Sequence, residues 1–76
     1  MNTVKTEEVG FSWSISRIEA AQVGWAQKNI SGSRYAPFDS RSLPPAKRSA
    51  FDGGYEIAQD GGTCPVDPAD LPEWAR

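Results

Sequence analysis

Three glycines lie inside the two segments of this 76-residue chain that otherwise have the apolar spacing of helices. Gly24 stands beside Trp25 in the first segment, and the pair Gly53-Gly54 precedes Tyr55 in the second. A glycine inside a helix costs up to about 1 kcal/mol relative to alanine, which often indicates that another element approaches the backbone closely. We expect the two helices to cross at these glycines. The alternative is a kink of the second helix at Gly53-Gly54.

The first helix has a clear start in the sequence. Ser16-Arg17-Ile18-Glu19 matches a capping box, in which the serine oxygen accepts from a backbone amide and the glutamate reaches back to the cap. The pattern predicts a helix that begins near Ser14 or Ser16 and ends between Gln27 and Ile30. Its apolar stripe is expected to contain Ile18, Ala21 and Trp25.

The second helix is expected to open at Pro44-Pro45, because a first turn does not need the missing N–H groups. Ser42 or Leu43 would then be its N-cap, and Gly61-Gly62 would end it. The predicted core-facing side chains are Ala46, Ala50 and Ile57, bordered by Phe51, Tyr55 and Ala58.

The predicted fold is mainly α, with two short packed helices joined by a basic aromatic loop. We divide the chain into an extended N-terminal segment (1–15), a two-helix core (16–60) and a Pro-rich acidic tail (61–76). Alternation of Phe11, Trp13 and Ile15 with serines indicates the extended segment. In the tail, residues 67–70 can form one helical turn. Leu71 and Trp74 are expected to anchor the tail on the core, although both could instead face a partner.

Composition excludes several functional classes. The chain has no histidine and one cysteine, so it can form no internal disulfide, lacks the usual zinc ligands and lacks the commonest general base. We therefore expect no enzymatic activity, no cofactor, no metal and no small-molecule substrate. No apolar run has the length of a membrane span, and the first residues do not resemble a signal peptide. These features favour a cytoplasmic protein.

Charge is distributed unevenly along the chain. Between positions 28 and 48 there are five cations and one carboxylate, a local charge of +4, whereas residues 60–76 carry four carboxylates and one cation, a local −3. Cations interleaved with aromatic rings suit phosphate contact and base stacking. We expect the loop's aromatic rings to pack mainly on the helices and its arginines to face a partner. The candidate RNA- or partner-binding residues are Arg34, Tyr35, Phe38, Arg41, Lys47 and Arg48.

From about Glu19 to Gln59 the chain resembles the ribosome modulation factor family, including its small ciprofloxacin-resistance and phage relatives. The resemblance rests on Gly24-Trp25, Gly32 with Arg34, Ala36-Pro37-Phe38, and Arg48 with Phe51, Gly53, Gly54, Tyr55 and Ala58. Ala36 stands where the family usually has cysteine, and the family is basic whereas this chain has a net charge of −2. The resemblance implies a two-helix fold that silences ribosomes by occupying ribosomal RNA near the messenger-binding region.

Two functions follow as expectations. The first is a small non-enzymatic protein that modulates translation by binding the ribosome or its RNA. The alternative is a phage or mobile-element inhibitor that binds a host protein complex, for example one involved in defence. Its candidate contacts are Phe11, Trp13, Asp67, Asp70, Leu71 and Trp74. A short hairpin with glycine crossings is also compatible with a homodimer.

Overall fold

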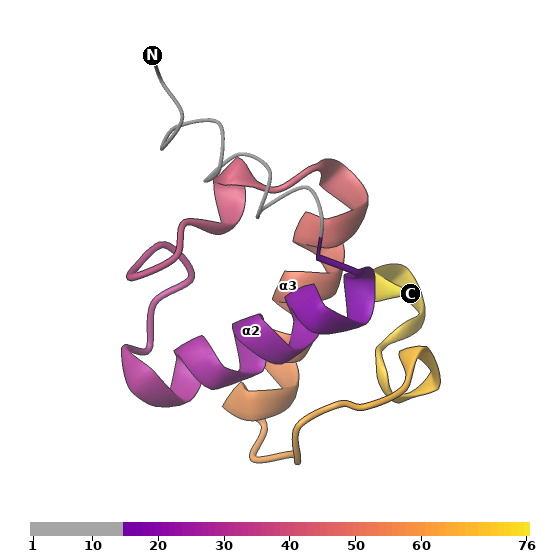
Figure 1. Ribbon diagram of the computed structural model, residues 1–76. Coiled ribbons are helices and arrows are strands. Elements are labelled where there is room, and N and C mark those ends of the chain that lie inside the picture. The colour runs from indigo at the N-terminus through magenta and orange to yellow at the C-terminus, as the bar shows by residue number, and fades with distance from the viewer. Residues whose placement is uncertain (1–14) are drawn as a thin grey trace.

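The computed structural model describes residues 15–76, and this part of the chain is helical without any strand (Figure 1). It contains two α-helices, α2 (Arg17–Ile30) and α3 (Pro45–Gln59). Three single 3-10 turns accompany them, η1 (Ser40–Ser42), η2 (Pro68–Asp70) and η3 (Glu73–Ala75). The predicted mainly α fold is confirmed. The predicted contacts Phe11 and Trp13, like nearly all of the expected extended segment, lie outside the described residues.

The start of α2 is the predicted capping box. The backbone amide of Glu19 donates to Ser16 Oγ at 3.1 Å, and the amide of Ser16 donates to Glu19 Oε1 at 2.7 Å. These hydrogen bonds from Ser16 hold the pKa of the Glu19 carboxyl below its usual value. The helix ends at Ile30, where the Ser31 amide donates to the carbonyl of Gln27. Both predicted ends of the first helix are confirmed.

The start of α3 differs from the prediction in its cap. The N-cap is Pro44, with Pro45 in the first turn, instead of Ser42 or Leu43. Ser42 is not available as the cap because it ends the separate turn η1, which the Asp39 side chain caps by accepting from the Arg41 amide. At its other end α3 stops at Gln59, and Gly61 adopts a positive φ of 83°. The predicted glycine stop is confirmed.

The two helices cross at Gly24 and Gly54, as predicted. A Cβ atom added to Gly24 would lie 2.1 Å from the carbonyl oxygen of Phe51, and one added to Gly54 would lie 1.8 Å from the carbonyl oxygen of Ala21. These positions therefore have room for hydrogen only. α3 runs through Gly53 and Gly54 as one continuous helix, so the pair marks a crossing point and not a helix break.

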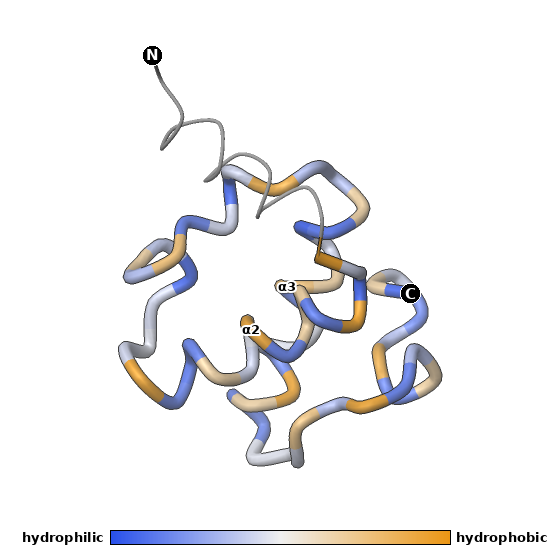
Figure 2. Tube along the Cα trace, viewed as in Figure 1, coloured by the Kyte–Doolittle hydropathy of each residue, from blue (hydrophilic) through white to orange (hydrophobic). Residues whose placement is uncertain are grey.

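The core around this crossing is built largely from alanines. Its buried members are four alanines and three larger residues, Ala20, Ala21, Ala50 and Ala75 with Leu43, Phe51 and Leu71. Ala46 was predicted to face the core but is exposed, because it lies in the first turn of α3, two turns before the crossing. Figure 2 shows hydrophobic residues interspersed with hydrophilic ones along both helices. In the described part of the chain no helix has both the length and the apolarity to cross a membrane.

The C-terminal segment packs back on both helices. Gln22 on α2 donates to the Pro65 carbonyl at 3.0 Å, and Trp25 Nε1 donates to the Gly62 carbonyl at 2.9 Å. Leu71 is 2% exposed and anchors the segment as predicted, whereas Trp74 is 54% exposed and does not. Ala75 occupies the inward position, because Gly53 leaves space there for a methyl group and not for an indole. The predicted single turn after Asp67 is η2.

Candidate binding surface on the loop

The buried side chain of Gln27 makes three hydrogen bonds to the loop between α2 and α3. Its Nε2 donates to the carbonyls of Ser33 and Phe38, both at 2.7 Å, and its Oε1 accepts from the Phe38 amide at 3.0 Å. Only 3% of Gln27 is exposed, so these bonds form away from bulk water. The sequence analysis missed this residue. The available signal was a polar side chain three positions after Gly24, on the face that the crossing buries.

Further hydrogen bonds fix the course of the loop. Tyr55 on α3 donates its hydroxyl proton to the Gly32 carbonyl at 2.7 Å. Ser31 Oγ donates to the Ala36 carbonyl, and Ser33 Oγ accepts from the Tyr35 amide at 3.1 Å. The loop is therefore tied to both helices, and its exposed side chains project from a defined backbone.

The two loop aromatics point in different directions. Phe38 packs against the core, with its ring stacked on Phe51 at a centroid distance of 6.2 Å, as expected. Tyr35 was also expected to tuck against the helices, but it is 51% exposed. The place against the Phe51 ring is taken by Phe38, and the Tyr35 ring instead contacts the guanidinium of Arg41.

Arg34 is held by α3. Its guanidinium lies 4.7 Å from the centroid of the Tyr55 ring and forms ion pairs with Asp52 at 3.5 Å and Glu56 at 3.8 Å. Its side chain is 32% exposed. The local charge of +4 counted along the sequence did not include these carboxylates, which lie further along the chain. The Arg34 charge is thus already balanced inside the fold.

Arg41 remains on the surface. Its Nε and Nη2 donate to the two carboxylate oxygens of Asp39, each at 3.0 Å, and its guanidinium lies 4.5 Å from the centroid of the Tyr35 ring. The Arg41 side chain is 60% exposed and that of Asp39 is 42% exposed. Hydrogen bonding from Arg41 lowers the pKa of the Asp39 carboxyl, and the same pair raises the pKa of Arg41.

The two cations of the first turn of α3 are Lys47 and Arg48, and Arg48 is exposed. The hydrogen bonds from Arg41 are the main cause of the lowered pKa of Asp39, and the charge of Arg48 adds to it. The hydrogen bonds from Ser16 are the main cause of the lowered pKa of Glu19, and the charge of Lys47 adds to it. Direct contacts bring together Tyr35, Arg41 and Asp39, and we group the exposed Arg48 with them. We call these four residues the loop surface.

The alternative contact set of the C-terminal segment is divided between structural and exposed positions. Asp67 and Asp70 form the capping box of η2, and Leu71 is buried. Only Trp74 of this set presents a large apolar surface to solvent. Within residues 15–76 no group of three His, Cys, Asp or Glu side chains is placed to hold a metal ion. Compared with known proteins, the chain matches no family model, no curated protein and no solved structure.

Proposed function

We propose that the protein is a small non-enzymatic RNA-binding module that modulates translation by contacting ribosomal RNA through the loop surface. The observation that carries the proposal is the exposed Tyr35 ring with the Arg41 guanidinium 4.5 Å from its centroid. An exposed ring can stack on a base whatever the base identity, and a neighbouring guanidinium can contact phosphate. Arg48, in the first turn of α3, adds a second exposed cation.

The Asp39–Arg41 pair does not prevent phosphate binding. Both side chains are largely exposed, and ion pairs between exposed side chains contribute little to stability because water screens them. A phosphate can therefore replace the carboxylate of Asp39 as the partner of Arg41. Base stacking on an aromatic side chain contributes roughly 1–3 kcal/mol per base, enough for the loss of Tyr35 to weaken binding measurably.

The resemblance to the ribosome modulation factor family supports the choice of ribosomal RNA among nucleic acids. In this proposal Phe38 and Arg34 fix the loop on α3 and do not contact RNA. Phe38 is stacked on Phe51, and Arg34 forms ion pairs with Asp52 and Glu56. The direct contacts are accordingly fewer than the sequence pattern predicted.

The test is co-sedimentation of the protein with ribosomes on sucrose gradients at several salt concentrations. We expect binding that weakens as salt rises, because phosphate contacts release counterions. Arg41→Gln is expected to weaken binding and to lower the slope of log K against log salt by about 1. Tyr35→Ala is expected to weaken binding without changing that slope.

The matched control is Arg17→Gln, an exposed arginine at the other end of α2 from the loop. This variant should sediment with ribosomes as the parent protein does. Protein that stays at the top of the gradient at low salt would contradict the proposal. Equal losses in Arg17→Gln and Arg41→Gln would contradict the assignment to the loop surface.

A further inference from the structure

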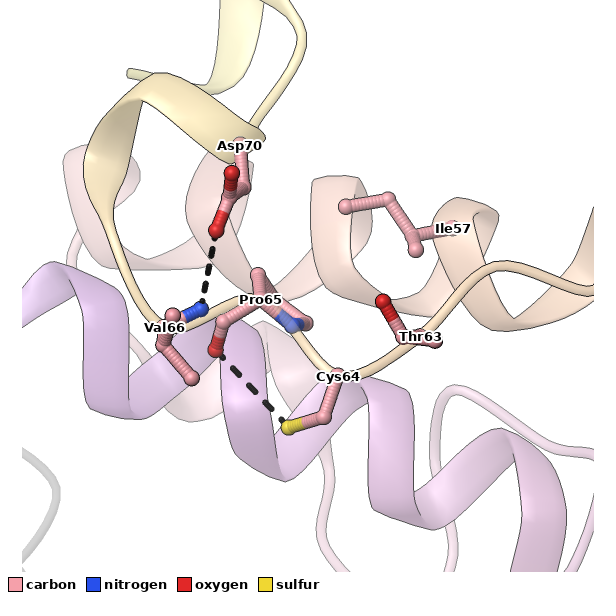
Figure 3. Close-up of a pocket in the computed structure, with 6 residues that line it drawn as sticks. All are labelled: Ile57, Thr63, Cys64, Pro65, Val66 and Asp70. Carbon is pink, nitrogen blue, oxygen red and sulfur yellow. Dashed lines mark hydrogen bonds between the residues drawn. The ribbon is translucent and has the colours of Figure 1, made fainter.

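A pocket of about 290 Å³ lies where the chain turns back after α3. It is lined by Ile57, Thr63, Cys64, Pro65, Val66 and Asp70. Figure 3 shows Cys64, Pro65 and Val66 along the returning segment, with Asp70 reaching toward Val66 from the η2 turn and Ile57 and Thr63 at the α3 side. The volume is at the lower limit of the roughly 300–1,000 Å³ that is usual for small-molecule sites. A single side chain of a partner fits it better than a cofactor-sized ligand.

The lining has an apolar part that the fold does not use. Val66 is 75% exposed, although its neighbour Pro65 is among the largest fully buried side chains. Ile57 is only partly buried and packs on the core with its other surface. These aliphatic groups offer contact area to an apolar side chain that enters the pocket.

The pocket lies in an acidic segment. All four charged residues between positions 60 and 75 are carboxylates, namely Asp60, Asp67, Asp70 and Glu73. Asp70 Oδ2 accepts from the amides of Val66 and Asp67, and Asp67 Oδ1 accepts from the amide of Ala69. The Asp67 side chain also accepts from the Asp70 amide in the capping box of η2. Both carboxylates are exposed, so a cation of a partner can approach them.

The cation at the end of this segment offsets one of these four charges and leaves a net charge of −3 over residues 60–76. Arg76 Nε donates to the Leu71 carbonyl at 2.9 Å and Nη2 to the Ala69 carbonyl at 3.3 Å, so its guanidinium is directed at the backbone of the segment itself. A strand of nucleic acid would meet repulsion from the four carboxylates. A positively charged polypeptide would meet attraction.

We propose that this acidic pocket docks a basic peptide segment of a partner protein, with one aliphatic side chain in the pocket. The lysine or arginine residues on either side of that side chain then pair with Asp67 and Asp70. This interaction surface is separate from the loop surface and does not depend on RNA binding. The protein would then have an acidic surface that binds a partner protein, in addition to the basic loop surface.

The test is an NMR titration of the ¹⁵N-labelled full chain with the peptide acetyl-Lys-Lys-Leu-Lys-Lys-amide. Two comparison peptides replace the leucine by glycine or all lysines by glutamate. We expect saturable shifts of the Thr63, Cys64 and Val66 amides with the leucine peptide. Affinity should fall about tenfold for the glycine peptide, and the glutamate peptide should cause no such shifts.

The variant Val66→Lys places a cation at the pocket, and Ile30→Lys is its matched control, because Val66 and Ile30 are 75% and 74% exposed. Val66→Lys should lose the response to the leucine peptide, and Ile30→Lys should keep it. The proposal is overturned if millimolar leucine peptide leaves the pocket amides unshifted, or if the glutamate peptide shifts them equally. It is likewise overturned if an RNA oligonucleotide, and not the peptide, perturbs these amides.

Discussion

The helix crossing and the loop are both fixed in this small domain, but by opposite means. At the crossing, glycines at positions 24 and 54 bring backbone against backbone, and the surrounding side chains are mostly alanines. In the loop, a single buried amide, Gln27, holds three backbone groups, and the surface above it is polar and exposed. Shape therefore determines the first region and hydrogen bonding determines the second. The crossing should tolerate no added atom, and the loop should tolerate most surface changes.

The largest effect is expected from Gly54→Ala or Gly24→Ala. The new methyl group would lie about 2 Å from a backbone carbonyl oxygen, which cannot rotate away as a side chain can. Overpacking costs typically about 1–3 kcal/mol and a clash with backbone belongs at the upper end of that range, whereas the gain in helix propensity is at most about 1 kcal/mol. A domain of this size has only about 3–5 kcal/mol of stability. Thermal unfolding followed by circular dichroism should show a melting temperature well below that of the parent protein.

Gly53→Ala tests the contact of α3 with the C-terminal segment and leaves the contact between the two helices unchanged. A methyl group at this position would approach Ala75 Cβ at 2.5 Å and Pro72 Cδ at 3.4 Å, and both atoms belong to the segment that covers α3. That segment can shift outward, so we expect a folded helix pair with increased hydrogen exchange after position 70. If Gly53→Ala and Gly54→Ala destabilised the protein equally, the backbone crossing would not be the dominant constraint.

An intermediate effect is expected from Gln27→Ala. The substitution leaves the Ser33 and Phe38 carbonyls and the Phe38 amide without their partner in a site that is 3% exposed. Buried backbone groups without partners cost about 1–3 kcal/mol each, reduced here wherever water can enter the space left by the side chain. We expect urea denaturation to show a loss of roughly 2–3 kcal/mol.

Gln22→Ala is the matched control for this prediction. Gln22 also donates to a backbone carbonyl, that of Pro65, but it makes one such bond and is only half-buried. Its removal should cost less than half as much as the removal of Gln27. Similar losses in the two variants would show that the loop does not depend on the buried amide.

The smallest effect concerns the Asp39–Arg41 pair on the loop surface. Hydrogen bonding from Arg41 lowers the pKa of Asp39, so the pair stabilises the fold above the ordinary pKa of 3.8 and this contribution is lost as pH falls through the lowered value. Arg41→Ala should raise the pKa of Asp39 toward its ordinary value, measured by NMR titration of the carboxyl carbon. The melting temperature at neutral pH should change little, since both side chains are exposed.

The backbone amide of Arg41 still donates to Asp39 in this variant, so the pKa should stay slightly below its ordinary value. Glu19 provides an internal reference, because its pKa is lowered by hydrogen bonds from Ser16 and not by Arg41. A pKa of Asp39 that Arg41→Ala leaves unchanged would contradict the pairing on which the loop surface is built.

The sequence predicted most residues of the candidate site, but it did not predict which of their charges are paired within the fold. The sequence identified the loop with Tyr35, Phe38 and Arg41. It could not show that Arg34 pairs with Asp52 and Glu56, because those residues become neighbours only when α3 packs beside the loop. It also could not decide which aromatic ring faces inward, since Phe38 and Tyr35 are both suitable and only one contacts Phe51.

The sequence by itself determined what depends on neighbours along the chain. The Ser16 capping box, the proline start of α3 and the glycine stop at position 61 are local, and each lies within about one turn of the residues that specify it. Glycines at positions 24 and 54 also favoured a close crossing, because a glycine inside a helix has a cost that close contact with another element can explain. The tertiary structure decided the direction of Arg34, Tyr35 and Trp74, because the inward positions are set by residues far away in the sequence. Arg34 pairs with α3, the Phe51 ring is contacted by Phe38 in place of Tyr35, and the position beside Gly53 is occupied by Ala75 in place of Trp74.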